Sequence, residues 1–157
     1  MESTDEVATQ HTDTIEDTKM EEQKIDDSKS FVMPGKDKQL EKVEDLDSEA
    51  ISELKSKAST ITHIKLSGHS YGLEACEHIG DILEEAKNLT HIDFSNCFIG
   101  KLKDQILYNL KALLKNLEGR SITYVDFSDN AFGPSGVPGF ESFIKNTPSI
   151  QTLKMTN

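Results

Sequence analysis

A pattern of twelve residues recurs along the chain and limits what it can fold into. The pattern has apolar residues at positions one, four, six and eleven, an Asn, Cys or His at position nine, and glycine at position twelve. Full copies occupy residues 61–72, 89–100 and 122–133, and a partial copy begins at residue 150. Because the copies begin 28, 33 and 28 residues apart, the chain is expected to stack similar structural units side by side.

The spacing within each copy is typical of a leucine-rich repeat, in which a short strand is followed by a turn and a helix. Alternation along each strand places the apolar residues in the core and turns the residues between them outward. These outward residues are polar and of mixed charge, which favours a protein partner over a small-molecule pocket. The sequence therefore predicts an α/β leucine-rich-repeat solenoid (ribonuclease-inhibitor-like), with parallel strands on the concave face and helices on the convex face.

The ninth position of each copy is expected to serve the turn. An Asn side chain there satisfies backbone groups with its amide, so a structural role for Asn130 is favoured over a catalytic one. Cys97 is a usual alternative at this position, and His69 departs from the pattern. The 33-residue unit places its extra residues at 99–108, and insertions in solenoids usually lie on a rim.

The N-terminal third of the chain differs in composition from the rest. Residues 1–50 hold sixteen of the 28 acidic residues, together with six lysines, whereas residues 51–157 are close to neutral. We expect residues 1–38 to form a disordered acidic tail, with a short apolar patch at 31–35 that covers the first repeat. Apolar residues at helical spacing over 40–58 predict a capping helix. The expected domain is thus 39–157: this helix and about three and a half repeats, truncated at the C-terminus.

Composition and motifs exclude several classes of function. The near-neutral repeat region lacks the basic face of a nucleic-acid-binding protein. We find no phosphate-binding loop, no cofactor motif, no defensible catalytic triad and no closed set of metal ligands, so neither a cofactor nor a metal is expected. The presence of only two cysteines favours a reducing compartment. We find no secretory segment and no membrane-spanning segment in the sequence, so neither secretion nor membrane insertion is expected. The chain is not expected to be an enzyme.

Three segments carry a resemblance to a known family. They are LSGHSYGLEA at 66–75, FIGKLKD at 98–104 and FSDNAFGPSGVPGFE at 127–141. Together, and at this separation, they resemble the Ran GTPase-activating proteins, which are built from leucine-rich repeats. The resemblance covers residues 45–157 and only the N-terminal repeats of that family.

The resemblance implies a GTPase activator without its own catalytic centre, a monomer that binds GTP-bound Ran in nucleocytoplasmic transport and is located in the cytoplasm or near the nucleus. It implies that Asn157 and Lys101 act on the GTPase active site, Lys101 standing where the family has an arginine. Contacts with Ran are expected from four further residues, Lys103, Asp104, Asp129 and Asn130. An alternative remains open: a truncated repeat fragment that binds a partner without activating GTP hydrolysis.

Overall fold

Five short parallel strands form the centre of the computed structural model, which describes residues 26–156. Their order in the sheet follows their order in the chain, and every neighbouring pair is parallel. The strands are β1 (Ser30–Val32), β3 (His63–Lys65), β5 (His91–Asp93), β6 (Tyr124–Asp126) and β7 (Thr152–Lys154). A second, two-stranded parallel sheet pairs β2 (Gln39–Leu40) with β4 (Ser70–Tyr71).

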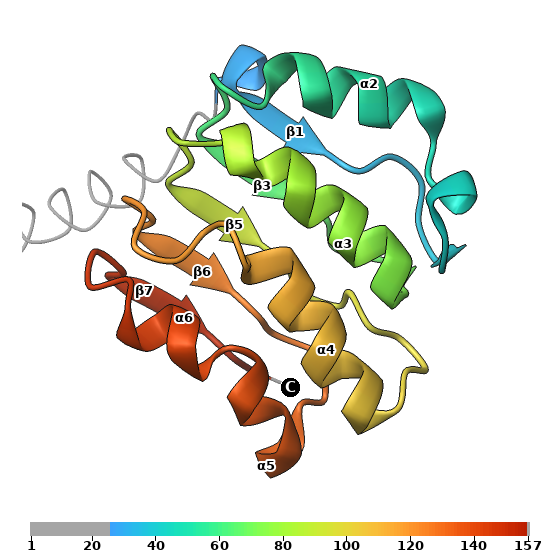
Figure 1. Cartoon of the computed structure of the whole chain (residues 1–157), viewed down its shortest axis with the longest axis vertical. Coiled ribbons are helices and arrows are strands. Elements are labelled where there is room, and N and C mark those ends of the chain that lie inside the picture. The colour runs from blue at the N-terminus through green and yellow to red at the C-terminus, as the bar shows by residue number, and fades with distance from the viewer. Residues whose placement is uncertain (1–25, 157) are drawn as a thin grey trace, which may run out of the picture.

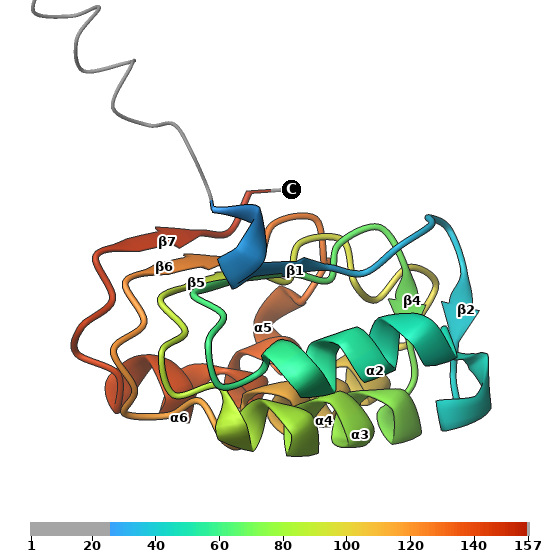
Figure 2. The ribbon, with the colours of Figure 1, turned by 90° about the horizontal axis from the view of Figure 1, so that it is seen from above.

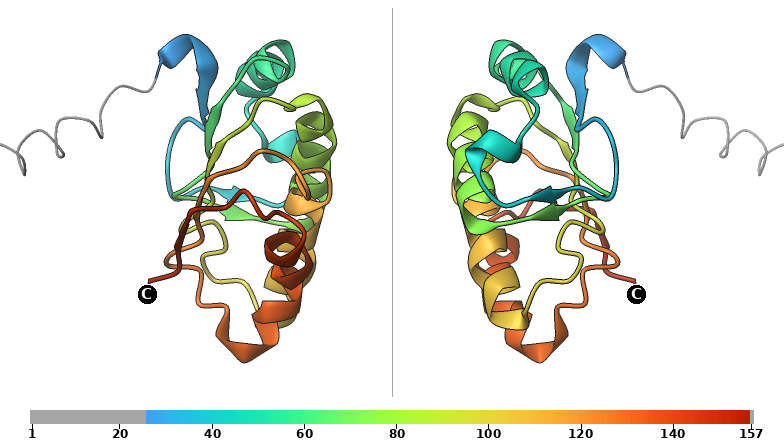
Figure 3. Two further views of the ribbon diagram at one scale, coloured as in Figure 1. Left: turned by 90° about the vertical axis from the view of Figure 1, so that its left-hand side faces the viewer. Right: turned by 90° about the vertical axis from the view of Figure 1, so that its right-hand side faces the viewer.

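Helices lie on one face of the five-stranded sheet, so the molecule has two layers (Figures 1 and 2). The α-helices are α2 (Ser48–Lys57), α3 (Leu73–Ile82), α4 (Lys103–Leu114), α5 (Gly133–Gly136) and α6 (Glu141–Lys145). Short 3-10 turns are η1 (Asp27–Lys29), η2 (Val43–Asp45), η3 (Leu83–Glu85) and η4 (Val137–Gly139). Figure 3 shows the same separation of strands and helices from both sides. The expected α/β class with a parallel sheet is thus confirmed.

The strand register explains the apolar core. Ile64, Ile92 and Val125 are register partners at the centre of neighbouring strands and are at most 2% exposed. Phe31 occupies the equivalent place in β1, and Leu153 occupies it in β7. Leu153 is 41% exposed because β7 is the last strand of the sheet. Each inner strand therefore buries its central side chain between two neighbours and the helices.

A left-handed residue follows each of the three inner strands at the eighth position of the repeat. Gly68, Asn96 and Asp129 have φ angles of +91°, +49° and +61°. Glycine, asparagine and aspartate are the residues that adopt this conformation most readily. Backbone hydrogen bonds join these turns in series: Gly68 N–H donates to the Asn96 carbonyl at 3.0 Å, and Asp129 N–H donates to the Thr156 carbonyl at 2.7 Å. The turns after successive strands therefore line up along one edge of the sheet.

Ordered structure begins earlier than the predicted domain boundary at residue 39. Strand β1 pairs with β3, and Phe31 and Met33 are 1% and 3% exposed. These two apolar side chains cover the first repeat and draw residues 30–33 into the sheet. Residues 1–25 of the expected acidic tail lie outside the described residues.

The single helix predicted over 40–58 is only partly correct. Residues 48–57 form α2, whereas the residues before it form β2 and η2. The Asp47 carboxylate accepts the backbone N–H of Ala50 at 2.9 Å and so caps α2 at its start. Leu40 and Leu46 are still buried, but from extended and turn conformations. Among the helices of residues 26–156, none has the length and apolar character needed to cross a membrane.

Candidate functional site

The edge formed by the aligned turns holds most of the residues that the sequence singled out. Lys101, Lys103 and Asp104 lie in and just after the loop that leads into α4, and Asp129 lies in the turn after β6. The side chains of Lys103, Asp104 and Asp129 are exposed. Two neighbouring repeats therefore present both positive and negative charges on this edge, which we call the rim.

Lys103 connects these two repeats. It is the first residue of α4, and its side chain extends toward Gly133, the first residue of α5. A Cβ added at Gly133 would lie 3.4 Å from Lys103 Nζ. The ammonium group thus lies over the turn region that also contains Asp129, which keeps a positive charge beside the rim.

The environment of the Lys101 side chain differs from that of the exposed Lys103 side chain. Lys101 forms an ion pair with the Glu41 carboxylate through its ammonium group, and its side chain is 9% exposed. Burial lowers the pKa of Lys101. A cavity of about 310 Å³ adjoins the pair, lined by Glu41, Gly72, Leu73, Lys101, Gln105, Tyr108 and Asn109. Sequence reasoning missed Glu41, because no spacing rule connects residues 60 positions apart.

Asn130 is buried and serves the turns. Its Oδ1 accepts the backbone N–H of Cys97 at 2.7 Å, and its Nδ2 donates to the carbonyls of Phe94 and Phe127 at 2.8 and 2.9 Å. At 3% exposure the side chain offers no surface to a partner. The expected contact between the Asn130 side chain and Ran therefore does not fit its position, whereas the structural role favoured by the repeat pattern does.

Asn157 lies outside the described residues. The residue before it is held in place, since Thr156 N–H and Thr156 Oγ1 both contact Ser128 Oγ, at 3.2 and 3.1 Å. The Thr156 carbonyl accepts the N–H of Asp129. The segment after β7 is therefore hydrogen-bonded, at Thr156, to the turn after β6.

The face of the sheet opposite the helices bears a row of stacked rings. The His63 and His91 rings are 4.0 Å apart between centroids, and His91 and Tyr124 are 5.4 Å apart. The Nδ1 atoms of His63 and His91 are hydrogen-bonded to the hydroxyls of Thr62 and Thr90, each at 2.8 Å. Burial lowers the pKa of both imidazoles, and for His63 the neighbouring His91 lowers it further. Neutral rings therefore predominate on this face at neutral pH.

Among residues 26–156 no group of three or more His, Cys, Asp or Glu side chains is placed to hold an ion. Cys76 and Cys97 are buried free thiols, and burial raises the pKa of each. Such thiols are poor nucleophiles and poor ligands, because the thiolate is the reactive form.

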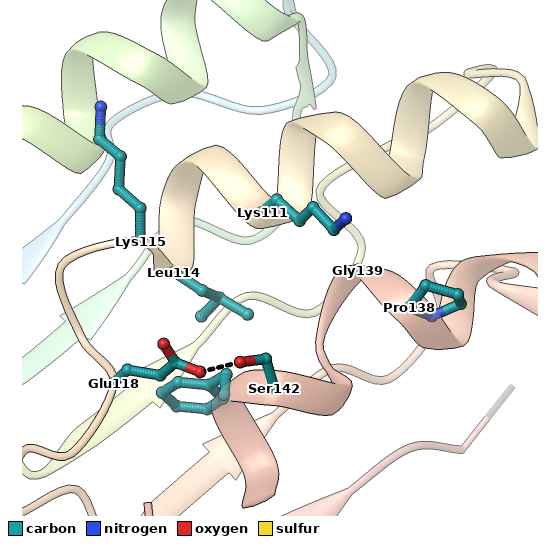
Figure 4. A pocket seen from close by; sticks show the side chains of 8 residues that line it. Lys111, Leu114, Lys115, Glu118, Pro138, Gly139 and Ser142 are labelled. Carbon is teal, nitrogen blue, oxygen red and sulfur yellow. Dashed lines mark hydrogen bonds between the residues drawn. The ribbon is translucent and has the colours of Figure 1, made fainter. Parts of the chain in front are cut away.

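A second groove lies on the helical side of the molecule, between α4 and the segment containing η4 and α6 (Figure 4). Its volume is about 310 Å³, and it is lined by Lys111, Leu114, Lys115, Glu118, Pro138, Gly139, Ser142 and Phe143. Glu118 accepts hydrogen bonds from Ser142 and from Asn146, which lower the pKa of its carboxyl. Lys115 pairs with Asp81 on α3 at 2.5 Å. These polar contacts connect neighbouring helices, so we interpret the groove as the packing interface between two repeats.

Comparison with known proteins gives a consistent result. No family model matches the chain. It is 37% identical to Ran GTPase-activating protein 1 of Xenopus laevis over 98 residues, which are 60% of this chain and 17% of that protein. It is 33% identical to the Ran GTPase-activating protein of Drosophila melanogaster over 106 residues, 65% of this chain and 18% of that protein. The identity to Ran GTPase-activating protein 2 of Caenorhabditis elegans is 32% over 113 residues, 69% of this chain and 12% of that protein.

The names of these relatives place them in a regulatory class, the GTPase-activating proteins. Over the matched region the chain is similar to the Ran GTPase-activating proteins, which confirms the resemblance found in the sequence. The matched region spans less than a fifth of the length of these three relatives.

Proposed function

We propose that this chain is a leucine-rich-repeat solenoid that binds GTP-bound Ran through the rim of aligned turns and stimulates GTP hydrolysis. The proposal is supported by sequence similarity combined with the position of three exposed charged residues. The chain is about one-third identical to Ran activators, and Lys103, Asp104 and Asp129 are exposed together on one edge. Residues 30–58 serve as the cap of the first repeat in this proposal, since Phe31 and Leu54 close its apolar end.

The proposed mechanism is positioning rather than covalent chemistry. Hydrolysis of GTP needs a water held in line with the leaving group and charge placed where it develops in the transition state. Lys103, Asp104 and Asp129 would dock Ran, while Lys101 and Asn157 would act near the nucleotide, as the resemblance implies. An ammonium at position 101 supplies charge without the planar fork of an arginine, so its contribution is electrostatic. A role in nucleocytoplasmic transport, and a location in the cytoplasm or near the nucleus, follow as part of the same proposal.

Single-turnover hydrolysis of Ran-GTP tests the proposal directly. The chain at increasing concentration is expected to raise the hydrolysis rate. The double variant Lys103→Ala, Asp129→Asn, in which Asn tolerates the positive φ at position 129, is expected to need a higher concentration for the same rate. Lys111→Ala removes an exposed charge on the helical side and serves as the matched control, with an unchanged rate. Stimulation by wild type that the double variant retains in full would contradict the rim as the docking surface.

A second candidate function is supported by the environment of Lys101. Its ammonium group is paired with Glu41 and its side chain is 9% exposed, so the charge is not offered to a partner in this conformation. The chain would then bind Ran without stimulating hydrolysis. Equilibrium binding of Ran carrying a non-hydrolysable GTP analogue distinguishes the two: binding with no change in the hydrolysis rate supports this candidate over the activator.

A further inference from the structure

The backbone of Glu41 is fixed by three contacts. Its N–H donates to Asp45 Oδ2 at 3.0 Å, and its carbonyl accepts the N–H of Ala75 at 3.3 Å, in the first turn of α3. It also lies directly against Gly72, where an added Cβ would be 2.8 Å from the Glu41 Cα and carbonyl oxygen. The Glu41 side chain therefore starts from a well-defined position between β2 and α3.

The loop that carries Lys101 is fixed as well. Lys101 N–H donates to the Phe98 carbonyl at 3.1 Å, and the Gln105 side chain accepts the N–H of Leu102 at 3.0 Å. Gly100 supplies a φ of +75° that lets the loop turn back toward α3. The ion pair between Glu41 and Lys101 thus connects two segments whose backbones are fixed by hydrogen bonds. One segment belongs to the N-terminal cap and the other to the rim.

The two lysines of this loop have opposite environments. The Lys101 side chain is 9% exposed and faces a carboxylate, whereas Lys103 is exposed beside the turn after β6. A cation that is covered and neutralised cannot contact a partner unless its ion pair opens. The Glu41 side chain is 47% exposed, so water reaches the pair from that side and opening requires no unfolding.

We propose that Glu41 withholds Lys101 from the partner, so that the ion pair must open before Lys101 contributes to the activation of Ran. This inference rests on the proposed function and adds a regulatory residue to the same site. Double-mutant measurements on solvent-exposed ion pairs correspond to at most about a fivefold change in an equilibrium, and the 47% exposure of the Glu41 side chain brings this pair into contact with water. Removing the Glu41 charge is therefore expected to increase the availability of Lys101 by about two- to fivefold.

Competitive acylation of the lysines, read by mass spectrometry at each site, measures this availability without any GTPase. In Glu41→Gln the acylation of Lys101 is expected to be about two to five times faster than in wild type, because opening of the pair no longer limits it. The rate at Lys103 is expected to stay constant and serves as the internal standard. Glu44→Gln removes an exposed carboxylate three residues away and is the matched control. Equal acylation of Lys101 in wild type and Glu41→Gln overturns the inference.

The hydrolysis assay separates this inference from the proposed function. Glu41→Gln is expected to stimulate Ran-GTP hydrolysis more than wild type at the same subsaturating concentration, and Lys101→Ala in the Glu41→Gln background is expected to abolish the gain. Stimulation by wild type that Glu41→Gln leaves unchanged or lowers overturns the inference alone. No stimulation by either protein overturns the proposed function as well. Glu41→Asp, which keeps the charge on a shorter side chain, serves if the Gln variant has a reduced unfolding temperature.

Discussion

Asn130 accepts the backbone N–H of Cys97 at 2.7 Å, across 33 positions of sequence and between the turns of two neighbouring repeats. The amide also donates to the Phe94 carbonyl in the same neighbouring repeat and to the Phe127 carbonyl in its own. One buried side chain thus satisfies three backbone groups that water cannot reach. Together with the backbone hydrogen bond from Asn96 N–H to the Ser128 carbonyl, this contact sets the relative positions of the two turns.

Replacing Asn130 by Ala is expected to destabilise the fold by about 1–3 kcal/mol, because it leaves buried backbone donors and acceptors without partners. Urea unfolding followed by circular dichroism measures the change. Ser121→Ala, an exposed substitution just before the same repeat, is the control and is expected to change stability by less than about 0.5 kcal/mol. A loss for Asn130→Ala no larger than the control would show that the amide network is not formed.

The repeat pattern predicted the strands well, because it depends on local chemistry. Apolar side chains two residues apart, followed by a residue that tolerates positive φ, define a strand and its turn at Ile92, Phe94 and Asn96. The start of the fold was harder to predict. Phe31 lies in an acidic segment, and its strand is stabilised by pairing with β3. A local sequence pattern does not reveal this distant partner.

The close approach of α3 and α4 reverses the usual effect of a glycine. Alanine in place of a glycine inside a helix normally stabilises by about 0.5–1 kcal/mol. At Gly80, however, an added Cβ would lie 2.2 Å from the Ala112 carbonyl oxygen, a backbone atom that cannot move without shifting α4. Gly80→Ala is therefore expected to destabilise by about 1–3 kcal/mol.

Thermal and urea unfolding of Gly80→Ala measure this effect. Glu77→Ala, on the exposed side of the same helix, tests helix propensity alone and is expected to be neutral within about 0.5 kcal/mol. A Gly80→Ala variant as stable as wild type would mean that the two helices are farther apart than the structure has them.

The stacked imidazoles predict a pH dependence of stability. Burial lowers the pKa of His63, His91 and His69 in the folded protein, so the unfolded chain binds protons more readily below the ordinary value of about 6.5. The contribution of these histidines to stability is therefore fully present above pH 6.5 and is lost as the pH falls through that value toward the pKa of the folded state. His69 adds to this effect, since its Nε2 is buried without a hydrogen-bond partner.

Urea unfolding at several pH values between 7.5 and 5 measures the dependence, and NMR titration of the imidazole signals assigns it to residues. The double variant His63→Asn, His91→Asn is expected to show a shallower slope. Imidazole pKa values at or above 6.5 for both His63 and His91 would contradict the expectation.

The rim residues were only partly predictable, and Lys101 shows why. Sequence position places it beside Lys103, and both carry the same charge. Their environments differ because Glu41, from another part of the chain, reaches one ammonium group and not the other. Side-chain partners of this kind depend on the packing of the cap against α3, which spacing along the sequence does not reveal.

Arg120 lies ahead of β6, at the opposite end of that strand from the turn that contains Asp129. Its Nη1 donates to the Leu83 carbonyl at 2.9 Å and its Nη2 donates to the Glu84 carbonyl at 2.6 Å, at the C-terminal end of the α3 and η3 segment. A lysine keeps the charge but lacks the planar fork that reaches both carbonyls at once. Arg120→Lys is expected to cost about 0.5–1.5 kcal/mol, one net hydrogen bond. Lys145→Ala, which breaks an exposed pair with Glu141, is the control and should cost less than about 0.5 kcal/mol. Equal stability of Arg120→Lys and wild type in urea unfolding would show that one donor suffices. A loss in the control as large as in Arg120→Lys would show that the planar fork contributes no more than an exposed ion pair.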